Sequence, residues 1–184
     1  MKDSIITEYL IGDYQKVTRI LRNQKDPDRV NLINLIDKEC KDLNRYDGKA
    51  VYRVDFLENC DFAFNFFKLN LGKVVCFPSI LSTYRKISDF PILEKNLEFY
   101  IKFILCFETT AIDAMEISNS IKTENEVFFM PNTCFLIDSI FNNQIVLKEC
   151  KETPYIIFFN GVGPYQRQKS KTETKASLSD QNII

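Results

Sequence analysis

Two glutamates separated by one residue, Glu124 and Glu126, stand directly before an apolar stretch at residues 127–130. This stretch predicts a β-strand, in which side chains two apart project from the same face of the sheet. The two carboxylates would then point into one small volume. Such a pair suits a reaction in which positive charge develops on a sugar carbon, because one carboxylate can stabilise the cation while the other handles a proton. The alternative, which the motif taken alone favours, is a solvated turn that carries two acids.

Two features upstream offer groups for a phosphate and a sugar. Arg53 lies in a predicted strand and presents a fixed fork of donors that fits a phosphate. A hydroxyl-rich turn with Ser79, Ser82 and Thr83 closes the next predicted strand, and its hydroxyl groups can hold a sugar. With the glutamates, these groups describe a site for a sugar-phosphate compound whose glycosidic bond is broken, and NAD is a candidate because nicotinamide leaves readily. The alternatives are that Arg53 is an exposed strand residue covering apolar surface and that Ser82 and Thr83 cap a helix beginning at Tyr84.

The composition removes several classes of chemistry. The chain of 184 residues has no histidine, which excludes Ser-His-Asp and Cys-His catalysis, HExxH zinc sites and C2H2 fingers. The formal net charge of -1 provides no basic field for nucleic acid, and no glycine-rich phosphate loop is present. None of the 6 cysteines forms a CxxC pair. We therefore expect free thiols, no metal cofactor and no nucleic-acid partner.

The order of these residues resembles the mono-ADP-ribosyltransferases of the Arg-Ser-Glu type, on the cholera-toxin-like and vertebrate ecto-enzyme side of that superfamily. The resemblance covers most of residues 5–150. Its most specific part runs from Glu124 to Phe135, where ENEVFFMPNTCF is similar to the family's ExEVLFxPGTxF block. Further similar parts are an N-terminal helix ending in Leu21-Arg22, the strand Val51-Tyr52-Arg53, and the stretch Phe77–Thr83, which is similar to the approach to the family's Ser-Thr-Ser motif.

The resemblance implies a role for each candidate residue. Arg53 would contact the NAD phosphates, and Ser82 would position the nicotinamide ribose and the key acid. Glu126 would bind the ribose 2′-hydroxyl and stabilise the oxocarbenium-like transition state. Glu124 would engage the acceptor, and a glutamate at that position goes with arginine as the acceptor. The other two hydroxyl residues expected in cofactor binding are Ser79 and Thr83.

The resemblance thus implies NAD-dependent mono-ADP-ribosylation of protein arginine residues, with NAD as co-substrate, release of nicotinamide, and a target protein with an accessible arginine as partner. One alternative is NAD glycohydrolase activity. Another is a catalytically inactive NAD-binding or protein-interaction module of the same fold. Two departures from the family pattern support the last alternative: Val54 stands where a glycine usually follows the strand arginine, and Tyr84 replaces the last residue of Ser-Thr-Ser.

The elements that must position these residues follow from the apolar periodicity. Spacings of three and four predict helices over residues 5–23 and after Asp28, and a short aromatic helix is expected over 61–68. Alternating and apolar runs predict strands at 50–56, 73–77, 97–107, 127–129, 134–137, 145–147 and 155–159, with a polar turn at 78–83. This order predicts an α+β fold, in which N-terminal helices precede a mainly antiparallel two-sheet β core of ADP-ribosyltransferase type.

The chain is expected to form a single ADP-ribosyltransferase-like domain over residues 1–163. Residues 164–184 are rich in Lys, Gln, Ser and Thr and predict a disordered polar tail. No signal peptide and no segment of transmembrane length is recognised. A cytoplasmic protein without a membrane span is expected, with secretion by a non-classical route as the alternative.

Overall fold

The computed structural model describes residue 5 and residues 14–54, 60–89, 100–117, 125–142, 144–152 and 157–158. The predictions for Glu124 and for the tail at 164–184 lie outside these residues. So does most of the stretch that precedes residue 14. No helix in the described part of the chain is long and apolar enough to cross a membrane.

Among the described residues, three α-helices are present: α2 (Tyr14–Arg22), α3 (Arg29–Cys40) and α4 (Cys60–Leu69). The second predicted helix is confirmed, because α3 begins directly after Asp28. The short aromatic helix is confirmed by α4. Helix α2 lies inside the first predicted helix and ends at Arg22, close to the predicted end.

The described strands form one hydrogen-bonded sheet in the order β5-β6-β3-β1-β4-β8-β7-β2-β9. All neighbouring strands are antiparallel except the pairs β4–β8 and β2–β9. The predicted α+β class with a mainly antiparallel core is therefore confirmed. The strands are β1 (Ala50–Val54), β2 (Val74–Phe77), β3 (Leu81–Tyr84), β4 (Tyr100–Ile104), β5 (Ala111–Asp113), β6 (Glu126–Phe129), β7 (Thr133–Phe141), β8 (Gln144–Cys150) and β9 (Ile157–Phe158).

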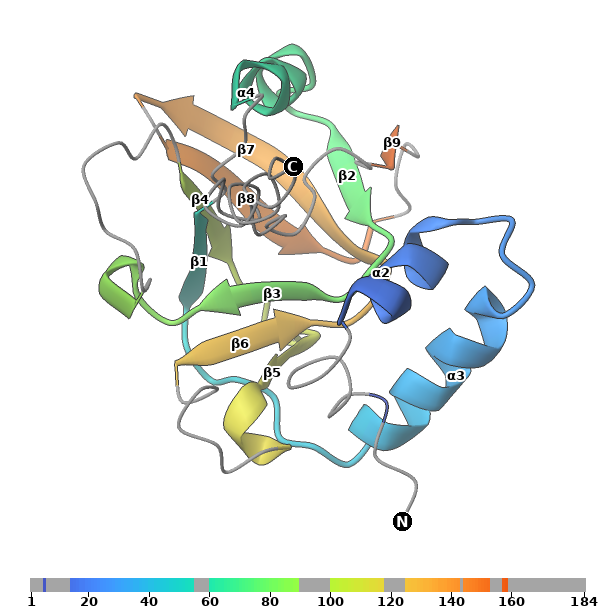
Figure 1. Cartoon of the computed structure of the whole chain (residues 1–184). Helices are drawn as coiled ribbons and strands as arrows, with labels where there is room; N and C mark the ends of the chain where they lie inside the picture. Colours follow the sequence, from blue (N-terminus) through green and yellow to red (C-terminus); the bar gives the residue numbers. More distant parts are fainter. Residues whose placement is uncertain are drawn as a thin grey trace, which may run out of the picture.

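The strands fall into two groups that run at a steep angle to one another (Figure 1). One group contains β3, β6 and β5, and the other contains β7, β8 and β2. In the ladder between β1 and β3, the described residues form one pair, Tyr52 with Tyr84. The two expected sheets are thus joined through β1 and β4 into one continuous hydrogen-bonded sheet.

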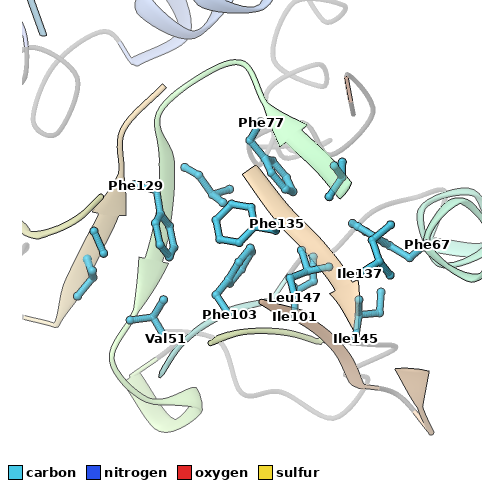
Figure 2. Close-up of a cluster of buried hydrophobic side chains, with 14 residues drawn as sticks. Val51, Phe67, Phe77, Ile101, Phe103, Phe129, Phe135, Ile137, Ile145 and Leu147 are labelled. Carbon is cyan, nitrogen blue, oxygen red and sulfur yellow. The ribbon is translucent and has the colours of Figure 1, made fainter. Parts of the chain in front are cut away.

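Phenylalanine rings from both groups of strands fill the space between them (Figure 2). The rings of Phe103 and Phe129 lie 5.0 Å from the ring of Phe135, and Phe77 lies 5.5 Å from it, measured between centroids. Their contacts with Phe135 are edge-to-face, which is a favourable arrangement for aromatic pairs. Strands β2, β4, β6 and β7 each contribute one ring, and Val51 of β1 and Leu81 of β3 belong to the same core, so this core also holds the strands that carry the candidate site.

A second apolar cluster covers the opposite side of β6. Leu21 of α2 and Ile36 of α3 are fully buried there together with Phe128. Val127 and Phe129 belong instead to the core between the two groups of strands. Strand β6 is therefore buried on both faces, and it holds Glu126 at its first position in a fixed place.

The prediction of a polar turn over residues 78–83 is wrong for its last part, because Leu81–Tyr84 forms strand β3. Ser82 and Thr83 accordingly do not cap a helix. Hydroxyl residues after a proline favour a turn locally, but pairing with β1 and β6 on the two sides of β3 overrides that preference. Strand β5 was not predicted from the sequence either.

Candidate active site

Three neighbouring strands, β1, β3 and β6, carry Arg53, Ser82 and Glu126. The register places Tyr84 directly opposite Glu126, and Ser82 opposite Phe128. Residues that face each other across a ladder, and residues two apart on one strand, share a face of the sheet. The side chains of Ser82, Tyr84 and Glu126 consequently lie together on one face.

A hydrogen bond joins two of the predicted residues. The hydroxyl Oγ of Ser82 donates to the carboxylate Oε1 of Glu126. Both side chains are half-buried, so the bond lies where water screens it only in part. The serine therefore fixes the direction in which the carboxylate points.

Arg53 reaches the same serine from the other side. Its guanidinium Nη1 donates to the main-chain oxygen of Ser82 at 2.8 Å. Alternation along β1 places Arg53 on the face of buried Val51, which is not the face that Ser82 and Glu126 share, so this hydrogen bond goes to the main chain of Ser82 and not to its side chain. Arg53, Ser82 and Glu126 are thus brought together, with Ser82 in contact with both partners.

The electrostatics of Glu126 reflect these neighbours. Burial raises the pKa of Glu126 above its usual range, and the Ser82 hydroxyl and the Arg53 charge partly offset this effect because both favour the ionised form. Burial, together with the nearby carboxylate, also raises the pKa of Tyr84. The site therefore pairs a carboxylate of elevated pKa with a neutral phenol. A carboxylate held in this way can stabilise a developing cation.

The two other hydroxyl residues are placed differently. Thr83 is fully buried on the core side of β3, and its hydroxyl donates to the main-chain oxygen of Val127 at 2.6 Å. It exposes no surface to a cofactor. Ser79 is also buried, in the segment between β2 and β3. A role of Ser79 in cofactor binding stays a prediction.

The entrance to β6 is held by residues that the sequence did not single out. The main-chain N–H of Arg85 donates to the oxygen of Asn125 at 3.0 Å, and the Arg85 guanidinium forms an ion pair with Asp113. Glu124 itself lies outside the described residues. Asp113 stands alone in an apolar stretch, so no pattern in the sequence points to this pair. Arg85 thus links Asp113 of β5 to Asn125, the residue between the two glutamates of the motif.

No protein-family model matches the sequence, nor does any curated protein. Solved structures do. The Vis ADP-ribosyltransferase of Vibrio splendidus, in complex with the M6 inhibitor, aligns with a TM-score of 0.57 and 21% identity over 86% of this chain and 78% of that chain. The C3 exoenzyme of Clostridium limosum aligns with a TM-score of 0.57 and 18% identity over 78% of this chain and 81% of that one. The chain has the ADP-ribosyltransferase fold.

A third similar structure was solved with a nucleotide. The ADP-ribosylating toxin BECa of C. perfringens, solved with NADH, aligns with a TM-score of 0.57 and 18% identity over 79% of this chain and 42% of that one. At these identities the likeness concerns the fold. The resemblance read from the sequence motifs is thereby confirmed at the level of the ADP-ribosyltransferase fold.

Proposed function

We propose that this chain is an NAD-dependent mono-ADP-ribosyltransferase that modifies arginine side chains of a target protein and releases nicotinamide. The observation that carries the proposal is the hydrogen bond from Ser82 to Glu126 beside the Arg53 guanidinium. The three residues come from three strands, β1, β3 and β6, and they follow one another along the chain in the order of the family motifs. The shared fold with ADP-ribosyltransferase toxins supports the same assignment.

Each residue has a distinct task in this proposal. Arg53 is a permanent cation and would bind the phosphates of the substrate NAD. When nicotinamide leaves, positive charge develops on the ribose carbon, and the Glu126 carboxylate would stabilise that charge and accept a hydrogen bond from the 2′-hydroxyl. Ser82 keeps the carboxylate in the required direction before the substrate arrives. No reorganisation of the carboxylate is then needed during the reaction.

The preference for arginine as acceptor is the finer part of the proposal. It rests on Glu124, two residues before Glu126, which would take a proton from the attacking guanidinium nitrogen. The Vis toxin, a structural neighbour at 22% identity, has been solved in complex with agmatine, which is a guanidinium compound. We expect Glu124→Gln to reduce transfer to arginine more than it reduces cleavage of NAD.

A second candidate is an inactive module that keeps the fold. The observation that favours it is Tyr84, which is the cross-strand partner of Glu126 and so shares the face of the sheet where substrate would have to bind. An NAD glycohydrolase is a third outcome, because the same residues serve when water is the acceptor.

Incubation with NAD labelled in its ADP-ribose part and an arginine-rich protein tests the proposal. We expect label on arginine, and a loss of at least about a hundredfold for Glu126→Gln, as for removal of an electrostatic stabiliser in other active sites. Glu152→Gln is the matched control, because Glu152 is exposed and lies just after β8, and it should leave the rate unchanged.

Other results would point elsewhere. Free ADP-ribose as the main product would favour the glycohydrolase. Full turnover by Glu126→Gln would contradict the mechanism, and a wild-type chain that neither binds nor consumes NAD would favour the inactive module.

A further inference from the structure

Three cysteines form a row across three neighbouring strands, away from the site described above. Cys134 of β7 lies directly opposite Cys76 of β2 on one side and directly opposite Cys150 of β8 on the other. Residues directly opposite in antiparallel strands share a face and have Cβ atoms about 4.5–5.5 Å apart. The three thiols are therefore neighbours on one face, with Cys134 in the middle.

The pair Cys76 and Cys134 has the closer geometry. The main-chain N–H of Ile137 donates to the oxygen of Lys73 at 2.9 Å, which marks these two residues as a hydrogen-bonded pair of the ladder. Such pairs alternate with non-hydrogen-bonded ones, so Cys76 and Cys134, three positions along, form a non-hydrogen-bonded pair, with Cα atoms about 4.5 Å apart. That separation falls within the range that a disulfide spans.

The two thiols also reach the same hydrogen-bond acceptor. Cys76 Sγ donates to the main-chain oxygen of Asn132 at 3.2 Å, and Cys134 Sγ donates to the same oxygen at 3.4 Å. Both sulfur atoms therefore lie within 3.4 Å of one oxygen, which keeps them in the same small volume.

The two thiols differ in their access to solvent. Cys76 has 4% of its surface exposed, whereas Cys134 and Cys150 are each partly exposed. Burial raises the pKa of Cys76 to about 12, with a further contribution from the neighbouring Cys134 thiol. Because thiolates are the reactive form, Cys76 reacts poorly with external reagents. A reagent from solvent therefore reaches Cys134 or Cys150 before it reaches Cys76, and Cys134 is the one that lies next to both other thiols.

We propose that Cys134 is a site of oxidative modification that forms a disulfide with Cys76 across the β2–β7 ladder, with Cys150 as the second partner. The oxidant is a peroxide. The Cys134 sulfur attacks one oxygen of hydrogen peroxide, the O–O bond breaks, and a sulfenic acid and one water form. Cys76 then reacts because it is held directly opposite Cys134: its sulfur gives up its proton as it attacks the Cys134 sulfur, the S–O bond breaks, and the disulfide and a second water form. Two thiols are oxidised, one peroxide is reduced, and both thiol protons leave in water.

This proposal does not rest on the proposed enzymatic function. Two other described cysteines have different surroundings. Cys40 is buried in the cluster of α3, and Cys106 lies beyond the end of β4 beside Glu149. Neither belongs to the row, so Cys106→Ser serves as the matched control.

The test is peroxide treatment of the folded chain, followed by alkylation of the remaining thiols and mapping of linked peptides by mass spectrometry without reduction. We expect a chain that has lost the mass of two hydrogen atoms and that contains a Cys76–Cys134 linked peptide. Cys134→Ser should lower the yield of intramolecular disulfide at least about tenfold, and Cys106→Ser should leave it unchanged. Cys76→Ser should redirect the bond to Cys134 and Cys150.

Three results would overturn the proposal. One is a folded wild-type chain in which Cys134 ends as sulfinic acid with no disulfide. Another is a set of disulfide-linked peptides in which Cys40 or Cys106 appears as often as Cys76, Cys134 and Cys150. A third is an undiminished yield of linked peptide in Cys134→Ser. Mapping of the wild-type chain decides the first two without any substitution, so a variant that fails to fold does not obscure the answer.

Discussion

Glu149 and Glu126 are both glutamates on strands, yet their surroundings differ sharply. Glu149 of β8 has 8% of its surface exposed, and its carboxylate is contacted by two main-chain N–H groups, those of Cys106 and Thr110, and by the hydroxyls of Thr109 and Thr110. Glu126 of β6 is half-buried. Among the described residues, one hydroxyl, that of Ser82, donates to it.

This difference separates a structural carboxylate from one available for chemistry. An ionised carboxylate has about four sites for incoming hydrogen bonds. At Glu149 the four contacts use this capacity and tie residues 106–110 to β8. At Glu126 the capacity is mostly unused by the described residues, while burial raises the pKa of the group. Glu126 can thus still accept a hydroxyl group or face a cation, whereas Glu149 cannot without giving up its present partners.

The largest expected effect is on stability, at Glu149. Glu149→Gln puts an amide NH2 against groups that are themselves donors, and leaving buried donors unpaired costs about 3 kcal/mol. We therefore expect the free energy of unfolding to fall by about that amount, measured by urea denaturation at pH 7.

The matched variant is Glu126→Gln, and its expected direction is the opposite. A carboxyl group whose pKa is raised in the folded state contributes stability at low pH and loses that contribution as pH rises through the folded pKa. At pH 7 a neutral glutamine removes the penalty, so unfolding stability should be unchanged or slightly higher. If Glu126→Gln lowered the free energy of unfolding more than Glu149→Gln does, Glu126 would be a structural carboxylate like Glu149, and the comparison would fail.

The candidate site could be predicted to a large extent because its residues lie in motifs with fixed spacing. Arg53, Ser82 and Glu126 were each recognised from short patterns, and the structure brings them together. Asn132 stands where the similar family block has glycine, and its φ of 64° is a left-handed conformation that asparagine tolerates. Such features depend on residues close in sequence.

What could not be predicted depends on contacts between distant segments. The sequence of strand β3 by itself favours a turn. The segment is extended because β1 and β6 pair with it on its two sides. Glu149 alternates with its neighbours like any strand residue, and its role requires the segment around Thr109 and Thr110, about 40 positions earlier. A local pattern carries no information about either partner.

The second effect concerns activity, at Ser82. Ser82→Ala removes the hydrogen bond to the Glu126 carboxylate, and bonds to charged groups are worth about 1.5–3 kcal/mol. If the proposed reaction takes place, NAD turnover should fall about 10- to 100-fold. The bond also lowers the pKa of Glu126, so its loss raises that pKa further. The acidic limb of the pH–rate profile should then move to higher pH. A drop in rate with an unmoved profile would mean that Ser82 does not act through Glu126.

The smallest effect is expected at Thr83, the next residue on the same strand, whose side chain lies on the other face. Thr83→Val keeps the shape of the side chain and removes the hydroxyl that donates to Val127. Loss of this buried bond should lower unfolding stability by about 1 kcal/mol, measured by urea denaturation. The KM for NAD should stay within about twofold of wild type, because Thr83 exposes no surface to a substrate. A large rise in KM would support the prediction that Thr83 takes part in cofactor binding. If Thr83→Val leaves KM unchanged while Ser82→Ala slows turnover, one face of β3 serves the reaction and the other serves the packing of the core.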